Sequence, residues 1–212
     1  FINVGSGIQF YFCGSVNYIN SDTFFEFNTN NETSLCAVND VNNAINVYFP
    51  NSILFGSLEV SGYAYMPSTL SVTNRVFVRI SNATDSRTLP HELGHYFNLL
   101  HTFQNSATTN LTEREYVTRN PMQGANCSTR GDLLCDTPAD PFGRDSLSLF
   151  GCSFQGIARD PQGNLYNPSL SNIMSYYPIT CGNNFTSGQY SRMNDGLLLR
   201  TYGGNQYTLN CG

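Results

Sequence analysis

The sequence of 212 residues contains no lysine, so all 10 of its basic residues are arginine. Charged residues make up only 12% of the chain, and the net charge is -5. This balance argues against nucleic acid or an anionic membrane as the main partner. No apolar run reaches the roughly 18 residues that a membrane-spanning helix needs. The start lacks a basic segment followed by an apolar one, so we interpret the chain as a mature form.

Histidine is also scarce, because the chain has only 3 and all lie in one short stretch. His91 and His95 are four positions apart, which puts their imidazoles on one face of a helix. Glu92 points beside that face, where it could hold a metal-bound water. Asn98 can end the helix in the left-handed conformation, so that His101 returns to the same ion. Three nitrogen ligands and an open fourth position are typical of catalytic zinc.

A second element is needed, because a short histidine motif also occurs by chance on exposed helices. The third histidine at this offset already weakens that alternative. Proteins with this extended motif place a methionine in a tight turn under the metal. Met174 alone would more often fill a core. Here it is followed by Tyr176 within the segment Asn172–Pro178, which supports the zinc interpretation.

With these residues the sequence resembles the metzincin metallopeptidases and, within them, the pappalysin (cytophagalysin) family. The resemblance extends to Gly131–Pro138 (GDLLCDTP), to Cys181 with Phe185–Gln189 (FTSGQ), and to Gly62–Pro67 (GYAYMP). It therefore touches most of the chain. The family has glycine where this chain has Asn98, and both residues suit the turn that ends the helix.

The resemblance implies an α+β fold and a single metzincin-like catalytic domain over residues 1–212. We expect an upper lobe, about residues 1–101, with a mixed twisted sheet and the zinc helix. The lower lobe, about residues 102–212, should be loop-rich, stapled by disulfides and completed by a C-terminal helix. The family usually has another strand and a long helix first, so this chain has an abbreviated start, or is a fragment or a processed form.

Local patterns predict the elements of this fold. Strands are predicted at residues 8–13, 44–49, 58–66 and 75–80, and helices from 88 to about 97 and from about 187 to 199. Residues 17–33 are interpreted as a loop with some extended structure. In the family, the strand before the last one is an antiparallel edge to which a peptide can add. A simple sheet edge with no binding role is the alternative.

Seven cysteines with no CxxC zinc spacing indicate disulfides and an oxidising compartment. The odd number leaves at least one cysteine unpaired or bonded outside the chain. The family resemblance favours two interleaved bridges, Cys127–Cys152 and Cys135–Cys181. Cys13 and Cys36 could form a third bridge, which would leave Cys211. We therefore expect a secreted, extracellular protein.

A second metal site is implied only by the resemblance. The Asp132 carboxylate and Thr137, with main-chain oxygens of Gly131 and Cys135, could hold a calcium ion. Calcium prefers such oxygen ligands. Aspartates that simply form turns are the alternative.

The function implied is that of a zinc endopeptidase that acts on proteins or peptides, with one catalytic zinc ion and a pro-segment in the precursor. Glu92 would assist the attack of a zinc-bound water on the peptide bond. Tyr176 would hydrogen-bond the oxyanion, or else be a buried aromatic residue. Met174 would lie under the metal site as a structural residue and would not bind the ion. The substrate should contact Gly62, Tyr63, Ala64, Tyr65 and Thr180. Arginine-preferring relatives carry an acidic residue where this chain has Thr180, so an arginine preference has no basis here.

Two other functions fit the same pattern. One is a binding or adhesion module that keeps the metal for structure, against which the intact Glu92 counts. The other is a zinc amidase that acts on cell-wall peptides. No wall-binding module is evident, and the predicted edge strand favours an extended peptide.

Overall fold

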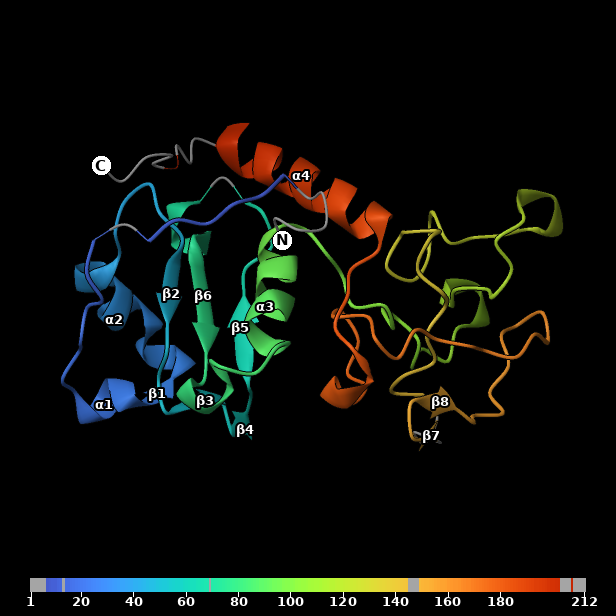
Figure 1. Cartoon of the computed structure of the whole chain (residues 1–212), viewed down its shortest axis with the longest axis horizontal. Helices are drawn as coiled ribbons and strands as arrows, with labels where there is room; N and C mark the ends of the chain where they lie inside the picture. Colours follow the sequence, from blue (N-terminus) through green and yellow to red (C-terminus); the bar gives the residue numbers. More distant parts are fainter. Residues whose placement is uncertain (1–6, 13, 69, 145–148, 203–206, 208–212) are drawn as a thin grey trace. The chain divides into compact units, whose positions relative to one another are not determined.

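The structure, a computed structural model, describes residues 7–12, 14–68, 70–144, 149–202 and 207 (Figure 1). The chain divides into two units, residues 1–98 with 193–212, and residues 99–192. The C-terminal residues thus group with the first unit rather than with the predicted lower lobe. Among the described residues, no helix combines the length and the apolar character needed to cross a membrane. The assignment of the whole chain to one catalytic domain stays a prediction.

The first unit carries most of the regular structure, arranged in two small mixed sheets. One sheet has the order β1-β3-β4, and the other has the order β2-β6-β5. In each sheet one pair is parallel and one antiparallel. The elements are α1 (Asp22–Phe25), β1 (Glu26–Asn28), α2 (Glu32–Asn39), β2 (Asn46–Tyr48), β3 (Ser52–Phe55), β4 (Leu58–Glu59), β5 (Gly62–Ala64), β6 (Arg75–Val78) and α3 (Thr88–Tyr96). The predicted α+β class is confirmed.

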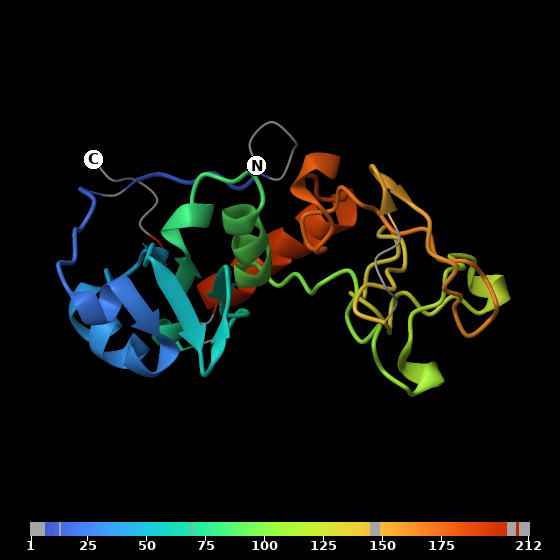
Figure 2. The same cartoon turned by 90° about the horizontal axis from the view of Figure 1, so that it is seen from below.

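The core of the first unit is built around β6, whose four residues are all buried. Such a continuous buried run is typical of a central strand covered on both faces. Phe77 stacks on Tyr48 and Tyr63, its cross-strand neighbours, with ring centroids 4.9 and 4.6 Å away, and on Phe27 at 5.0 Å. Helix α3 packs against β5 and β6 (Figures 1 and 2).

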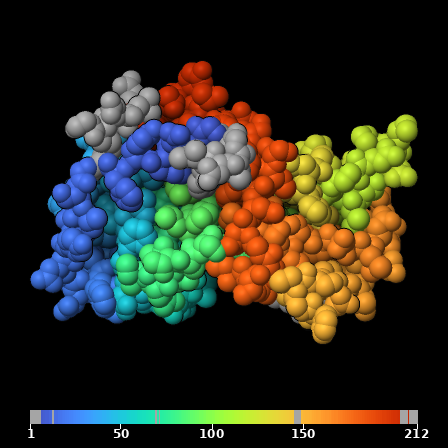
Figure 3. Space-filling model, viewed as in Figure 1, coloured from blue at the N-terminus to red at the C-terminus, as the bar shows by residue number. Residues whose placement is uncertain are grey.

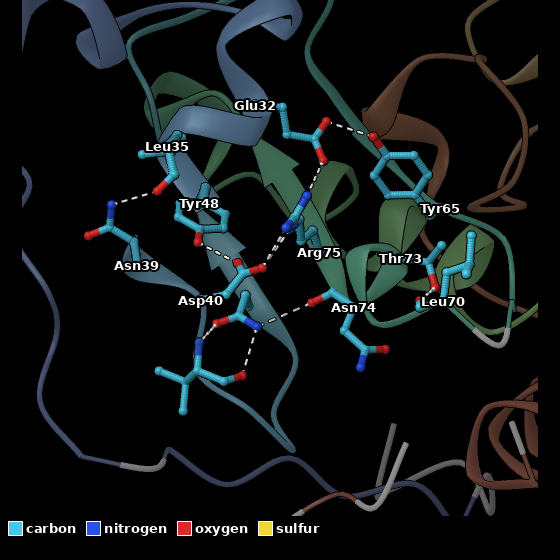
Figure 4. A network of polar contacts seen from close by, with 12 residues as sticks. Glu32, Leu35, Asn39, Asp40, Tyr48, Tyr65, Leu70, Thr73, Asn74 and Arg75 are labelled. Atoms are coloured by element: carbon cyan, nitrogen blue, oxygen red, sulfur yellow. Dashed lines mark hydrogen bonds and ion pairs between the residues drawn. The ribbon is translucent and has the colours of Figure 1, made fainter. Parts of the chain in front are cut away.

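A buried ionic network fixes α2 to the β2-β6-β5 sheet (Figure 4). Arg75 Nη1 lies 2.9 Å from Glu32 Oε1, and Arg75 Nη2 lies 2.7 Å from Asp40 Oδ2. Glu32 Oε2 accepts the hydroxyls of Tyr63 at 2.8 Å and Tyr65 at 2.6 Å. The residues that follow the start of β5 are thereby held by a carboxylate on α2.

Helix α4 (Ser187–Tyr202) begins in the second unit and ends in the first. Its fully buried Arg200 donates to the Tyr96 carbonyl at 2.7 Å and stacks on the Tyr96 ring, with 3.5 Å between the guanidinium carbon and the centroid. A methyl group on Gly196 would come within 2.2 Å of the Phe97 carbonyl oxygen. Both contacts fix the C-terminal end of α3, and the second requires glycine.

The second unit consists mainly of loops and one short hairpin, β7 (Leu149–Phe150) with β8 (Ser153–Phe154). Its bridges are Cys127–Cys135 and Cys152–Cys181, so the predicted interleaved pairing is wrong. Main-chain hydrogen bonds from residues 129 and 130 to the Asn126 carbonyl make a tight turn. The Cα atoms of Cys127 and Cys135 lie 5.0 Å apart, within the range of a disulfide.

Cys36 is a free, buried thiol, so the suggested bridge to Cys13 is also wrong. It lies in the apolar cluster of the first unit with Phe27, Leu35 and Ile53. Cys13 itself and Cys211 lie outside the described residues.

The predicted elements are confirmed in part. Strands β2 and β6 lie inside their predicted ranges, and α3 and α4 begin at the predicted residues Thr88 and Ser187. The predicted strand 58–66 is divided, because β4 pairs with β3 and β5 pairs with β6. Residues 17–33 hold the expected extended structure as β1, but they also hold helix α1 and the start of α2, where a loop was predicted. Elements β3, β7 and β8 were not predicted either.

The strand predicted at residues 8–13 is wrong over its described part. Residues 8–12 form no strand, and the Phe12 side chain is 98% exposed. Residues 9–12 are exposed, although Ile8 is buried, and the blue N-terminal part of the chain lies on the face shown in Figure 3. Its aromatic residues gave a strand signal, but no described strand pairs with them.

The ionic network predicts a large effect of Glu32→Gln on stability. The change removes the charge opposite Arg75 and weakens the acceptor of two tyrosine hydroxyls. We expect the free energy of unfolding, measured in urea, to fall by about 3 kcal/mol. Glu59→Gln is the control, since Glu59 pairs with Arg79 at 3.3 Å in a more exposed position, and should cost less than about 1 kcal/mol. Equal effects would contradict the prediction.

Candidate metal centre

Helix α3 presents two histidines from one face. Its start is fixed by Asp85, which accepts the Thr88 amide at 2.5 Å and the Thr88 hydroxyl at 2.6 Å. His91 and His95 follow four residues apart, and their Nε2 atoms lie 3.1 Å from each other. The helix ends before Asn98, whose φ of 79° is the predicted left-handed conformation.

The distance between the His91 and His95 ring nitrogens fits the binding of one zinc ion. Two nitrogens bound to one tetrahedral zinc at 2.0–2.1 Å would lie roughly 3.3 Å apart. The observed 3.1 Å is close to that value. His91 is buried and His95 is partly buried, so both side chains are at least partly shielded from bulk water.

Glu92, which lies between the two histidines in the sequence, is buried, with 6% of its surface exposed. Its Oε2 has no hydrogen-bond partner among the described residues. Burial raises the pKa of the Glu92 carboxyl to about 8. A buried polar atom without a partner is costly, and native structures keep few of them. The carboxylate is therefore placed for an interaction that the protein chain alone does not supply.

Gly62 at the start of β5 lies directly against Glu92. A methyl group added there would be 3.0 Å from both Cγ and Oε1 of Glu92, and 2.7 Å from the Phe77 carbonyl oxygen. Because the backbone oxygen cannot move as a side chain does, only glycine fits. Sequence reasoning placed Gly62 in the substrate strand but missed this contact, which only the tertiary structure shows.

Tyr63 and Tyr65, in β5 and just after it, have a different role from Gly62. The Tyr63 and Tyr65 hydroxyls are bonded to Glu32 inside the unit. Strand β5 ends its sheet among the described strands. A peptide at this edge would therefore meet main-chain atoms of Gly62–Tyr65 rather than the two tyrosine hydroxyls.

The third histidine belongs to the second unit. His101 Nε2 lies 3.0 Å from the Tyr176 hydroxyl, and the His101 ring stacks on Phe103 with 4.7 Å between centroids. Tyr176 is half exposed, which excludes the alternative of a buried aromatic residue. Met174 is fully buried, and its carbonyl accepts the Thr102 amide at 3.1 Å. The turn around Met174 is thus bonded to the residue after His101.

The proposed calcium loop has one feature that fits a cation. Asp132 is 1% exposed, and its Oδ1 accepts the Thr137 hydroxyl at 2.8 Å and the Leu134 amide at 3.0 Å. Its Oδ2 has no hydrogen-bond partner among the described residues. Gly131 has a φ of 64°, and a methyl group there would collide with the Glu115 carboxylate.

Glu115 is a second buried acid at this loop that the sequence did not reveal. It pairs with Arg119 at 2.9 Å, and burial raises the pKa of its carboxyl to about 8. Since it lies outside the loop motif, no local pattern marks it. Two other predicted residues add no support for a site. The Cys135 side chain forms a disulfide, and Thr180 is exposed next to Cys181.

The chain matches a family model described as pregnancy-associated plasma protein-A, peptidase family M43, over residues 28–198. It is 30% identical over 171 residues to extracellular metalloprotease 1 of Coccidioides posadasii, which covers 71% of this chain and 48% of that protein. It is 32% identical over 167 residues to an extracellular metalloprotease of Pyricularia oryzae, covering 70% and 46%. A Colletotrichum graminicola extracellular metalloprotease is 30% identical over 172 residues, covering 71% and 48%. The chain spans about half the length of these relatives.

The contact between Gly62 and Glu92 predicts that Gly62→Ala disturbs the metal centre. The added methyl group should displace β5 or the Glu92 side chain and lower the free energy of unfolding in urea by about 1–3 kcal/mol. The neighbouring Ser61→Ala is the control, because its side chain is exposed, and should change stability by less than about 0.5 kcal/mol. A crystal structure of Gly62→Ala with Glu92 and β5 unmoved would contradict the explanation.

Proposed function

The chain belongs to the pappalysin family, peptidase family M43, and on that premise we propose that it is the catalytic part of a secreted zinc endopeptidase. The observation that carries the proposal is the buried Glu92 carboxylate next to the His91–His95 pair, whose Oε2 finds no hydrogen-bond partner in the described part of the chain. A metal kept only for structure has no use for such a carboxylate. Zinc itself is implied by the family, and the relatives named above are extracellular metalloproteases.

We propose that His91, His95 and His101 bind the zinc ion. Among the described residues, these three histidines are the group of potential ligands that could hold a metal. Imidazole nitrogens suit zinc, and three of them leave one position open. The His91–His95 spacing within α3 supports two of the three ligands directly.

The bound zinc would supply a Lewis acid that polarises the scissile carbonyl and makes a water more acidic. Glu92 accepts the proton of the attacking water and passes it to the leaving amine. Burial raises the pKa of the Glu92 carboxyl, so its ionised form is a stronger base than a solvated glutamate. The exposed Tyr176 hydroxyl, next to His101, donates a hydrogen bond to the oxyanion of the tetrahedral intermediate.

The substrate would bind as an extended strand against β5. An open edge offers main-chain donors and acceptors every second residue, which gives affinity with little dependence on sequence. Thr180 is uncharged and exposed, so it supports no preference for arginine. Proteins and peptides are the proposed substrates, and a pro-segment in the precursor stays a prediction.

Calcium is proposed at the loop of Asp132, with Thr137 and the main-chain oxygens of Gly131 and Cys135. The support is the buried Oδ2 of Asp132, which needs a positive partner. Two arginines lie at this loop, but Arg192 donates to the main-chain oxygens of Asp132 and Leu133, and Arg119 pairs with Glu115. Calcium would hold the loop without taking part in the reaction.

The first test is hydrolysis of a denatured protein by the wild type and by Glu92→Gln, which keeps the side-chain volume. We expect the variant to retain one zinc per chain and to lose turnover by at least about 100-fold, because the general base is gone. A zinc chelator should abolish wild-type cleavage, and added zinc should restore it. Glu59→Gln, an exposed acid of the same unit, should cleave normally.

A wild type that binds zinc yet cuts nothing in a broad panel of proteins would overturn the proposal in favour of a binding module. Cleavage of cell-wall peptides but not of proteins would instead identify an amidase. Full activity of Glu92→Gln would refute the assigned role of Glu92.

The calcium loop predicts a dependence of stability on pH. Burial raises the pKa of Asp132 to about 6 and that of Glu115 to about 8. Both carboxyls thus bind protons more tightly when folded, so their contribution to stability is lost as the pH rises through these values. Without calcium, the melting temperature should fall between about pH 5 and pH 8. Calcium favours the ionised forms and should raise it most at the higher pH.

The matched variant is Asp132→Asn, measured by thermal unfolding with zinc supplied throughout. It should be less sensitive to pH and should lose most of the calcium response. Asp160→Asn, a change at a buried acid whose oxygens both have donors, should keep that response. The calcium site is refuted if wild type and Asp132→Asn respond equally.

A further inference from the structure

Asp140 is a buried carboxylate of the second unit, 4% exposed, with two donors on each oxygen. Its Oδ2 accepts the Thr102 hydroxyl at 2.6 Å and the Ser175 hydroxyl at 2.7 Å. Its Oδ1 accepts the Tyr177 hydroxyl at 2.9 Å and the Phe142 amide at 3.0 Å. An ionised carboxylate offers about four lone-pair sites, so all are used.

Three of these four donors adjoin residues assigned to the metal centre. Thr102 follows His101 directly. Ser175 and Tyr177 stand on either side of Tyr176. One carboxylate therefore fastens two chain segments, from which His101 and Tyr176 meet with 3.0 Å between ring nitrogen and hydroxyl.

We propose that Asp140 is a positioning residue that fixes the His101 imidazole and the Tyr176 hydroxyl relative to each other. The proposal rests on the function proposed above, which gives these two groups their roles. Hydrogen bonds to a buried charge are stronger than neutral ones and resist reorientation of the donor. Asp140 touches neither substrate nor metal in this account, and it acts through Thr102, Ser175 and Tyr177.

The saturation of Asp140 distinguishes it from Asp132 in the same loop region. Asp132 keeps one buried oxygen that no described residue contacts by a hydrogen bond, as a cation ligand would. Asp140 has no unused acceptor site, so it is not a further calcium ligand. The sequence alone groups both acids, because they lie close together in the chain.

Asp160 provides a matched control within the same unit. It is 5% exposed, and its two oxygens also accept two donors each, from Val117, Gln162 and both nitrogens of Asn164. None of these donors adjoins His101 or Tyr176. Loss of either charge should therefore lower stability similarly, and only loss of Asp140 should alter the metal centre.

The substitution Asp140→Asn has a defined consequence. Phe142 donates from a backbone amide, so the remaining oxygen of the new side chain must stay on that side. The amide nitrogen then faces the Thr102 and Ser175 hydroxyls, which lose their acceptor and have to turn. The disturbance falls on the residues that hold His101 and Tyr176.

The experiment compares wild type, Asp140→Asn and Asp160→Asn by kinetics, zinc release and imidazole NMR. For Asp140→Asn we expect kcat about tenfold lower with KM within about twofold, since orientation rather than binding is lost. Zinc should leave about tenfold faster, as for other changes behind a ligand. Asp160→Asn should match wild type in all three, whatever its melting temperature.

The NMR readout needs no turnover, because the chain has only three histidines to assign. Asp140→Asn should shift the imidazole nitrogens of His101 and leave those of His91 and His95 unchanged. If Asp140→Asn fails to fold, the double variant Thr102→Val with Ser175→Ala, which keeps the charge, should show the same changes.

Unchanged His101 resonances, zinc release and kcat in folded Asp140→Asn would overturn the proposal, as would equal changes in Asp160→Asn. A wild type that binds zinc but cleaves nothing would refute the proposed function only. The resonances and release rates would still decide the role of Asp140.

Discussion

The first unit depends on burying the polar face of helix α3 against strand β5. This contact removes Glu92 from water, and Gly62 lets the strand approach without displacing the carboxylate. Burial of an acid with a free oxygen costs stability. The aromatic stack around Phe77 and the Arg200 contacts to Tyr96 offset that cost. The stack holds the sheet that contains β5, and Arg200 holds the C-terminal end of α3. The contact between α3 and β5 is therefore held by the first unit itself.

The buried carboxylates that form no ion pair with an arginine fall into two kinds, and the difference separates structural acids from those expected to bind a cation or a proton. Asp140 and Asp160 have donors on both oxygens, so they fasten the loops of the second unit. Glu92 and Asp132 each keep a buried oxygen without a partner among the described residues. In a chain with so few charges, an unsatisfied buried acid is a specific sign of an expected cation or proton.

The parts that the sequence predicted are those set by local geometry. The spacing of His91 and His95 and the left-handed Asn98 follow from the helix itself, and both appear as expected. Strands of three or four residues, such as β1 and β3, are too short for a periodic signal. The strand prediction for the aromatic run at residues 8–12 was wrong because strand propensity does not reveal whether another strand is available for pairing. The disulfide pairing, the role of Gly62 and the donors of Asp140 depend on contacts between distant residues.

Anomalous X-ray diffraction at the zinc absorption edge tests the central claim most directly. Crystals of the wild-type chain grown with zinc should give one strong peak bonded to the Nε2 atoms of His91, His95 and His101, with the Glu92 carboxylate beside the fourth position. A peak elsewhere, a closed set of four protein ligands, or no peak at a zinc concentration that saturates other sites would contradict the account.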